Sequence, residues 1–214
     1  MKYVLRIHGR TAEGVPAELR HDEFVRGIRG LPVPWGLPDL GSFPFPGFDR
    51  DMTALFPLPN LQKGGFKGRV TYRYRRLLND SSSEDDVADV SFNPQKVDFA
   101  PLIDEVFPRY VQAFGAYFGY IGDEEFVHID FNRSRGFNRR AGVLRFYPVT
   151  FLDAELCRRA FGVPSSHLIE RFQNAGLPAQ PLKDGLLMVT HHGPVSIADC
   201  EELQARVTRL LEFD

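Results

Sequence analysis

A chain of 214 residues, of which 43% are hydrophobic and 25% charged, has a globular composition and is long enough to bury a substantial core. Its formal net charge of -2 excludes a general attraction to nucleic acid or to an anionic membrane, so such binding would require a local patch. Two cysteines, Cys157 and Cys200, exclude a disulfide framework and suit buried thiols in a reducing compartment. No apolar region follows Met1 and no apolar run approaches a membrane span, so we expect a cytoplasmic protein without a membrane partner.

The N-terminal part of the chain is predicted to be rich in strands. Residues 2–9 alternate between apolar and mainly polar positions, with Tyr3, Leu5 and Ile7 on one side, which indicates a half-buried strand. Residues 19–28 fit either a short helix or a second strand, and the glycines within and after them weaken the helical interpretation.

Residues 31–64 combine many prolines with aromatic residues. Because each proline removes a backbone donor and restricts the residue before it, we expect a long loop instead of a regular ladder. Its rings either cover a face of the sheet or offer an aromatic surface to a partner. Beyond this loop, alternation predicts strands over residues 69–77 and 87–92, joined by a polar, acidic loop at 80–86.

The segment from Asp98 to Phe161 carries the strongest pattern. Asp98 is a plausible N-cap, and apolar residues three or four apart predict a long helix over residues 98–121, followed by an acidic turn at 122–125. Alternation then predicts a strand at 126–131, an arginine-rich loop, and a second, antiparallel strand at 143–149.

Capping signals predict three further helices that begin near Asp153, Pro164 and Ser196, and residues 186–190 are predicted to form a short buried strand. The fold class is therefore α+β: a mostly antiparallel twisted sheet packed by about four helices, with the Pro- and aromatic-rich loop near the N-terminus. We predict a single domain over residues 1–214, with a β- and loop-rich part (1–97) and a helix–strand part (98–214).

Histidine and carboxylate side chains offer one enzymatic interpretation. His128 and Asp130 lie two residues apart, hence on one face of the predicted strand, close to the acidic turn. Together with His192 they could serve a metal-assisted hydrolase or nuclease if the three side chains converge. The sequence lacks the Gly-x-Ser-x-Gly, Walker, dinucleotide-binding, His-Glu-x-x-His and Cys-x-x-Cys motifs, and these absences argue against the common enzyme classes, so we predict that the chain is not an enzyme.

Four arginines and Phe137 crowd the loop at residues 132–141. They could bind RNA, a phosphorylated ligand or an acidic protein surface, or they could be neutralised by the acidic turn next to them. A basic face shared with the strand that begins at Arg69 would make a nucleic-acid-binding domain. The slightly negative net charge and the adjacent acidic turn favour a protein partner instead.

Four short runs within residues 97–161 carry a resemblance to a known family: Tyr110-Val-Gln-Ala-Phe-Gly-Ala-Tyr117, Gly122-Asp-Glu-Glu-Phe126, Ile129-Asp-Phe131 and Tyr147-Pro-Val149. This part of the chain resembles immunity proteins of bacterial polymorphic-toxin systems, which include contact-dependent and type VI secreted effectors. The resemblance implies a cytoplasmic protein that binds a cognate toxin one-to-one and masks its active site, without catalysis or a cofactor.

For such a protein, charge accelerates the encounter and buried rings supply affinity. The expected contacts with the toxin therefore come from the acidic turn, the arginine loop and the N-terminal aromatic segment. They are Asp123, Glu124, Glu125, Arg133, Arg135, Phe137, Arg139, Arg140, Trp35 and Phe45.

Overall fold

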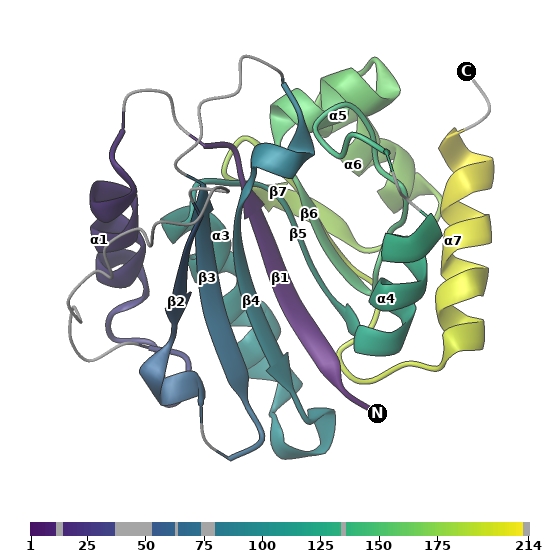
Figure 1. Ribbon diagram of the computed structural model, residues 1–214. Coiled ribbons are helices and arrows are strands. Elements are labelled where there is room, and N and C mark those ends of the chain that lie inside the picture. The colour runs from purple at the N-terminus through teal and green to yellow at the C-terminus, as the bar shows by residue number, and fades with distance from the viewer. Residues whose placement is uncertain (12–14, 37–52, 63, 74–79, 134–135, 212–214) are drawn as a thin grey trace.

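The computed structural model describes residues 1–11, 15–36, 53–62, 64–73, 80–133 and 136–211. Its strands form one open antiparallel sheet of eight strands in the order β2-β3-β4-β1-β5-β6-β8-β7 (Figure 1). The predicted α+β class with a mostly antiparallel sheet is confirmed. The strands are β1 (Tyr3–Gly9), β2 (Thr53–Pro57), β3 (Lys67–Arg73), β4 (Asp86–Phe92), β5 (Ala116–Asp123), β6 (Val149–Leu152), β7 (Ala179–Leu182) and β8 (Gly185–Val189).

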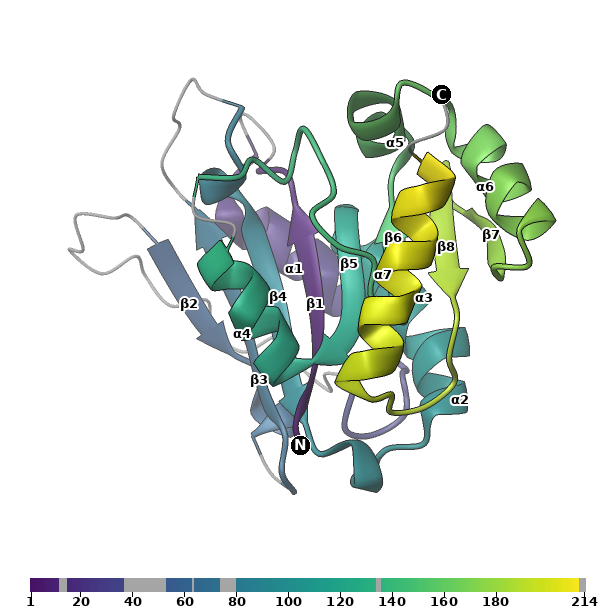
Figure 2. The ribbon, with the colours of Figure 1, turned by 90° about the vertical axis from the view of Figure 1, so that its right-hand side faces the viewer.

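Helices lie on both faces of the sheet, as Figures 1 and 2 show. The longer helices of the described residues, which outnumber the four or so expected, are α1 (Ala17–Ile28), α3 (Phe107–Ala113), α4 (Glu124–Arg133), α5 (Ala154–Phe161), α6 (Ser165–Asn174) and α7 (Ile197–Leu211). α1 and α3 bury their apolar side chains in one core, and α4 to α7 bury theirs in a second core on the opposite face. None of the described helices has the length and apolar character to cross a membrane.

β1 occupies the middle of the sheet, between β4 and β5. The predicted alternation is confirmed: Tyr3, Leu5 and Ile7 face the core formed with α1 and α3, and Arg6 faces the other side. The Tyr3 hydroxyl donates to the carbonyl of Val195 at 3.2 Å and accepts from its N–H at 2.7 Å, which ties β1 to the segment before α7.

The helix predicted over residues 98–121 is wrong in its second half. Helical turns run from Phe99 to Ala113, and Asp98 accepts the N–H of Ala100 at 3.1 Å as the predicted N-cap. Gly115 then adopts a φ of +61°, and the chain continues as β5, which is buried along its whole length. A strand buried on both faces is apolar without alternation, so its residues also fit a helical spacing.

The strand predicted at 126–131 and its partner at 143–149 are also wrong. The first segment belongs to α4, which begins because the Asp123 carboxylate accepts the N–H of Glu125 at 2.8 Å. The second segment is irregular until Val149, where β6 begins between β5 and β8. The alternation that suggested two strands is overridden by this cap and by the packing of α4.

The Pro- and aromatic-rich segment is described in part. Trp35 is 6% exposed and packs edge-on against Phe66 and Phe92, so this ring covers a face of the sheet. Residues 53–57 form the edge strand β2, which proline density concealed in the sequence. Pro57 stands at the end of this edge strand, where a missing backbone donor is tolerated.

Both cysteines are free and buried, as predicted. Burial raises the pKa of Cys157 to about 12 and the pKa of Cys200 to about 11. The two thiols therefore remain protonated at neutral pH and pack as small apolar side chains in the core between the sheet and α5 and α7.

Gly27 allows α1 and α3 to approach each other closely. A Cβ atom on Gly27 would lie 3.1 Å from the Cα atom of Ala113 and closer still to its Cβ. The glycine that weakens the helical pattern of the sequence is thus explained by packing between two helices.

We expect Gly27→Ala to lower the free energy of unfolding by about 1–3 kcal/mol, because overpacking outweighs the gain of about 1 kcal/mol in helix propensity. In an Ala113→Gly background the added methyl group has room, and the same change should be neutral or stabilising. Urea unfolding across this double-mutant cycle measures the coupling. Equal effects in both backgrounds would contradict the steric explanation.

Candidate functional site

A row of charged side chains crosses the part of the sheet that none of the described helices covers. The strand register places Arg69 of β3, Asp89 of β4 and Arg6 of β1 side by side. Asp89 forms an ion pair with Arg6 through one carboxylate oxygen and with Arg69, at 3.4 Å, through the other. Direct cross-strand neighbours of opposite charge stabilise a sheet, and this row contains one more guanidinium than carboxylate.

We call the hollow over this row the sheet groove. It consists of two adjoining cavities of about 540 and 340 Å³ that share Arg6, Arg69 and Asp89. β1, β3 and β4 form its floor, and α4 and residues 136–139 form one wall. β2 lies at the other side of this floor from α4 (Figure 1). Its lining residues include Arg6, Leu55, Arg69, Arg73, Asp89, Phe131 and Arg139.

The predicted acidic loop and the predicted arginine loop meet at one end of the sheet groove. The amide of Asn138 donates to the Asp80 carbonyl at 2.6 Å and accepts the N–H of Ser82 at 3.0 Å. Arg140 forms ion pairs with Asp85 at 2.7 Å and with Asp80 at 3.3 Å. The acids that neutralise Arg140 therefore come from the acidic loop and not from the acidic turn considered in the sequence.

Asp85 is a buried residue at the margin of the larger cavity of the sheet groove. It accepts hydrogen bonds from the Tyr117 hydroxyl and from Arg140, and His8 Nδ1 lies 3.5 Å from its Oδ2 atom. Burial lowers the pKa of His8, and the charge of Asp85 opposes this effect only in part. His8 is consequently neutral at pH 7, and its ring stacks on Phe118 at a centroid distance of 5.7 Å.

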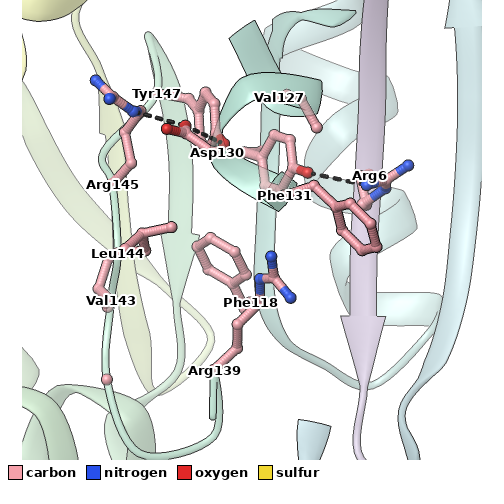
Figure 3. Close-up of a pocket in the computed structure, with 12 residues that line it drawn as sticks. Arg6, Phe118, Val127, Asp130, Phe131, Arg139, Val143, Leu144, Arg145 and Tyr147 are labelled. Carbon is pink, nitrogen blue, oxygen red and sulfur yellow. Dashed lines mark hydrogen bonds and ion pairs between the residues drawn. The ribbon is translucent and has the colours of Figure 1, made fainter. Parts of the chain in front are cut away.

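A buried ion pair fixes the α4 wall (Figure 3). The Asp130 carboxylate on α4 accepts hydrogen bonds from Arg145 at 2.6 Å and from the Tyr147 hydroxyl at 3.0 Å. The Arg145 guanidinium also lies 4.1 Å from the centre of the Phe126 ring on the same helix. These contacts position Phe131, the next residue along α4, at the sheet groove, where it is 56% exposed.

Some of the expected partner contacts lie at the sheet groove. Phe137 and Arg139 line its larger cavity. Glu124 lines the smaller cavity and accepts a hydrogen bond from Ser91 at 3.1 Å, whereas Glu125 is exposed at the start of α4. Arg135, Phe45 and the side chain of Arg133 lie outside the described residues.

Three expected contacts are buried and have structural roles. Trp35 packs in the core, Asp123 caps α4, and Arg140 is held by two aspartates. Side chains in such positions do not form a surface, so the binding site proposed below does not include them.

The residues of the hydrolase alternative do not converge. His128 is exposed on α4, with Nε2 3.2 Å from Asn132 Nδ2, whereas Asp130 points inward to Arg145. A two-residue spacing puts side chains on one face of a strand but on different faces of a helix, and this segment is a helix. Across the described residues, which include His192, no three His, Cys, Asp or Glu side chains are placed to hold a metal ion.

Asp89 and Phe131 are residues of one site that local sequence patterns do not reveal. Asp89 stands at an alternating position of β4, but its position between Arg6 and Arg69 depends on a strand order that the sequence does not reveal. Phe131 falls within the strand predicted at 126–131 and instead lies on the exposed side of a helix. The Asp123 cap was the signal that would have corrected this assignment.

No protein-family model and no curated protein sequence matches the chain. Its structure is similar to a solved structure, the Pseudomonas aeruginosa T6SS protein PA0821, with a TM-score of 0.54 and 14% sequence identity. The similarity covers 99% of this chain and 72% of that protein chain. At 14% sequence identity, the similarity between the two proteins concerns the fold alone.

We expect Asp130→Asn to lower the free energy of unfolding by about 3–5 kcal/mol, because the buried guanidinium of Arg145 loses its closest anionic partner. His128→Asn, on the exposed side of the same helix, is the matched control and should change this free energy by less than about 0.5 kcal/mol. Denaturant unfolding of the two variants measures the difference. Wild-type stability in Asp130→Asn would show that the pair does not hold α4.

The lowered pKa of His8 predicts destabilisation by acid. Below the ordinary pKa of 6.5, the unfolded chain binds a proton that the folded chain does not bind, so the free energy of unfolding falls as pH decreases. One such histidine contributes a slope of at most about 1.4 kcal/mol per pH unit. His21, whose pKa is also lowered by burial, acts in the same direction.

Urea unfolding between about pH 7 and about pH 5 measures this dependence. Replacing the titrating ring in His8→Asn should make the dependence on pH shallower. The same slope in the variant and in the wild type would exclude His8 as its source.

Proposed function

We propose that this chain is an immunity protein that binds a cognate toxin domain in the bacterial cytoplasm and neutralises it by covering the toxin's active site. The observation that carries the proposal is the sheet groove, an open hollow with a charged floor and an exposed aromatic side chain at its wall. Such a combination suits protein recognition, because charge increases the association rate and a desolvated ring contributes affinity. The proposed role requires no catalysis and no cofactor.

Two further findings support the proposed immunity role. The overall fold is similar to that of a T6SS protein over nearly the whole of this chain. Separately, four runs within residues 97–161 resemble immunity proteins of polymorphic-toxin systems. The structure assigns those runs to α3, β5, α4 and the start of β6, and of these elements α4 contributes Phe131 to one wall of the sheet groove.

Nucleic-acid binding is the second candidate function. Arg69 and Arg73 of β3 line the same cavity as Arg139 of the arginine loop, so part of the basic face that this alternative requires is present. Nucleic acid binds mainly through its phosphates, and its affinity therefore falls steeply as salt concentration rises. Titration with single-stranded and double-stranded oligonucleotides at several salt concentrations tests this alternative.

The proposed function predicts protection against the product of the gene encoded immediately beside this one. Co-expression should restore growth, and the two proteins should co-purify as a one-to-one complex because the proposed mechanism is stoichiometric masking. Growth curves and size-exclusion chromatography with light scattering measure the two effects.

An inactive variant of the neighbouring protein is the matched control. It should form the same complex without affecting growth, which separates binding from any effect on expression. Failure of the active form to bind this chain, together with unrelieved toxicity, would exclude that protein as the target and remove the support for an immunity role.

A further inference from the structure

Positive charge is in excess at the sheet groove, although the chain as a whole has a net charge of -2. The cationic side chains among its described lining residues are Arg6, Lys67, Arg69, Arg73 and Arg139, against three acidic ones. His8 at the floor adds no charge at neutral pH. The local charge is thus opposite in sign to that of the whole molecule, and a ligand that complements it is anionic.

Two of the three acidic side chains of the sheet groove are less available to a ligand than that of Arg69. Asp85 has a side chain that is only 1% exposed and is paired with Arg140. The side chain of Asp89 is 12% exposed and already forms ion pairs with two guanidinium groups. The side chain of Arg69, by contrast, is 56% exposed, and its contact with Asp89 is long, at 3.4 Å.

Arg73 has unused hydrogen-bonding capacity. Its Nη1 atom donates to the hydroxyl of Thr53, a neutral acceptor, at 2.7 Å. Its Nε atom is buried without an acceptor among the described residues. A guanidinium with a neutral partner and a donor to spare is suited to a carboxylate, which pairs with the planar fork of arginine.

Apolar side chains flank this basic floor. Leu55 of the edge strand β2 is 54% exposed and lines the smaller cavity, whereas Phe131 of α4 lines the larger one. A complementary ligand therefore carries carboxylates near its middle and apolar side chains on either side of them. A protein segment can provide this arrangement. A nucleic acid instead presents a phosphate at every step, and it would place these charges beside Asp89 and the apolar flanks.

We propose that the sheet groove binds an acidic segment of the toxin, whose carboxylates pair with Arg69, Arg73 and Arg139 and whose apolar side chains pack on Leu55 and Phe131. This inference rests on the proposed function for the identity of the partner. The chemistry of the ligand follows from charge complementarity and can be tested without the toxin.

Selection from a random short-peptide display library on the purified full chain provides that test. Peptides eluted from the wild type should be enriched in Asp and Glu next to apolar residues. In fluorescence anisotropy, Arg69→Glu/Arg139→Glu should weaken binding of the selected peptides by more than about tenfold. Arg109→Glu, an exposed charge reversal on α3 at the opposite face of the sheet, is the matched control and should leave affinity unchanged.

Two milder variants keep the test valid if the Arg69→Glu/Arg139→Glu variant does not fold. Arg69→Ala removes one exposed charge without adding another, and Phe131→Ser removes the exposed ring from α4, so both should fold and weaken binding. Enrichment of neutral or basic peptides, no enrichment over the library, or equal affinity in all groove variants would overturn the inference. Tighter binding of single-stranded oligonucleotide, with a steep salt dependence, would replace it with nucleic-acid recognition.

The toxin itself separates the two proposals. If the wild type protects cells and Arg69→Glu/Arg139→Glu protects them equally well, the immunity function holds and the acidic-segment inference is wrong. If acidic peptides bind in the sheet groove but no protection is observed, the ligand chemistry stands and the immunity function fails.

Discussion

β1 has one apolar face and one mainly polar face, and it lies next to β5, which is buried on both faces. The apolar face of β1 must be covered by α1 and α3, which leaves Arg6 and His8 on the opposite side of the sheet. β5 requires cover on that opposite side as well, and α4 to α7 provide it over β5 and the strands beyond. The helical layer therefore covers only part of the second face, and the uncovered strip from β1 to β3 becomes the sheet groove. The surface available to a partner is thus determined by which central strand is apolar on both sides.

Asp130 and Arg145 illustrate how the wall of this hollow is fixed in place. A buried ion pair loses much of its Coulombic gain to desolvation, and an apolar contact of the same size would often stabilise α4 equally well. Apolar contacts, however, are not directional and tolerate sliding of a helix, whereas Asp130 receives two directed hydrogen bonds, from Arg145 and Tyr147. We interpret the pair as a device that sets the rotation of α4, so that Phe131 projects at the groove and not into the core.

Local patterns in the sequence are sufficient to predict much of the fold. Alternation identified β1, β3 and β4, and capping residues located the starts of α5, α6 and α7. The errors occur where packing outweighs local pattern: β5 resembles a helix because both its faces are apolar, and α4 resembles a strand because its apolar residues happen to alternate. For the site, the sequence indicated Phe137 and Arg139 but could not pair Arg69 with Asp89, because that contact depends on strand order. The sequence also leaves the role of Trp35 open, since an aromatic ring near prolines can equally well pack in the core or contact a partner.

The central position of β1 also has a consequence for how the molecule assembles. The strand nearest the N-terminus pairs with β4 on one side and β5 on the other, and Tyr3 bonds to Val195 across most of the chain. During synthesis, the apolar face of β1 therefore stays exposed to solvent until much of the remaining chain has emerged from the ribosome. Such long-range pairing slows folding and exposes the nascent chain to aggregation. A fragment that ends before β5 would leave one side of β1 without its partner strand, so separate production of the two halves of the chain would yield an open sheet edge in each.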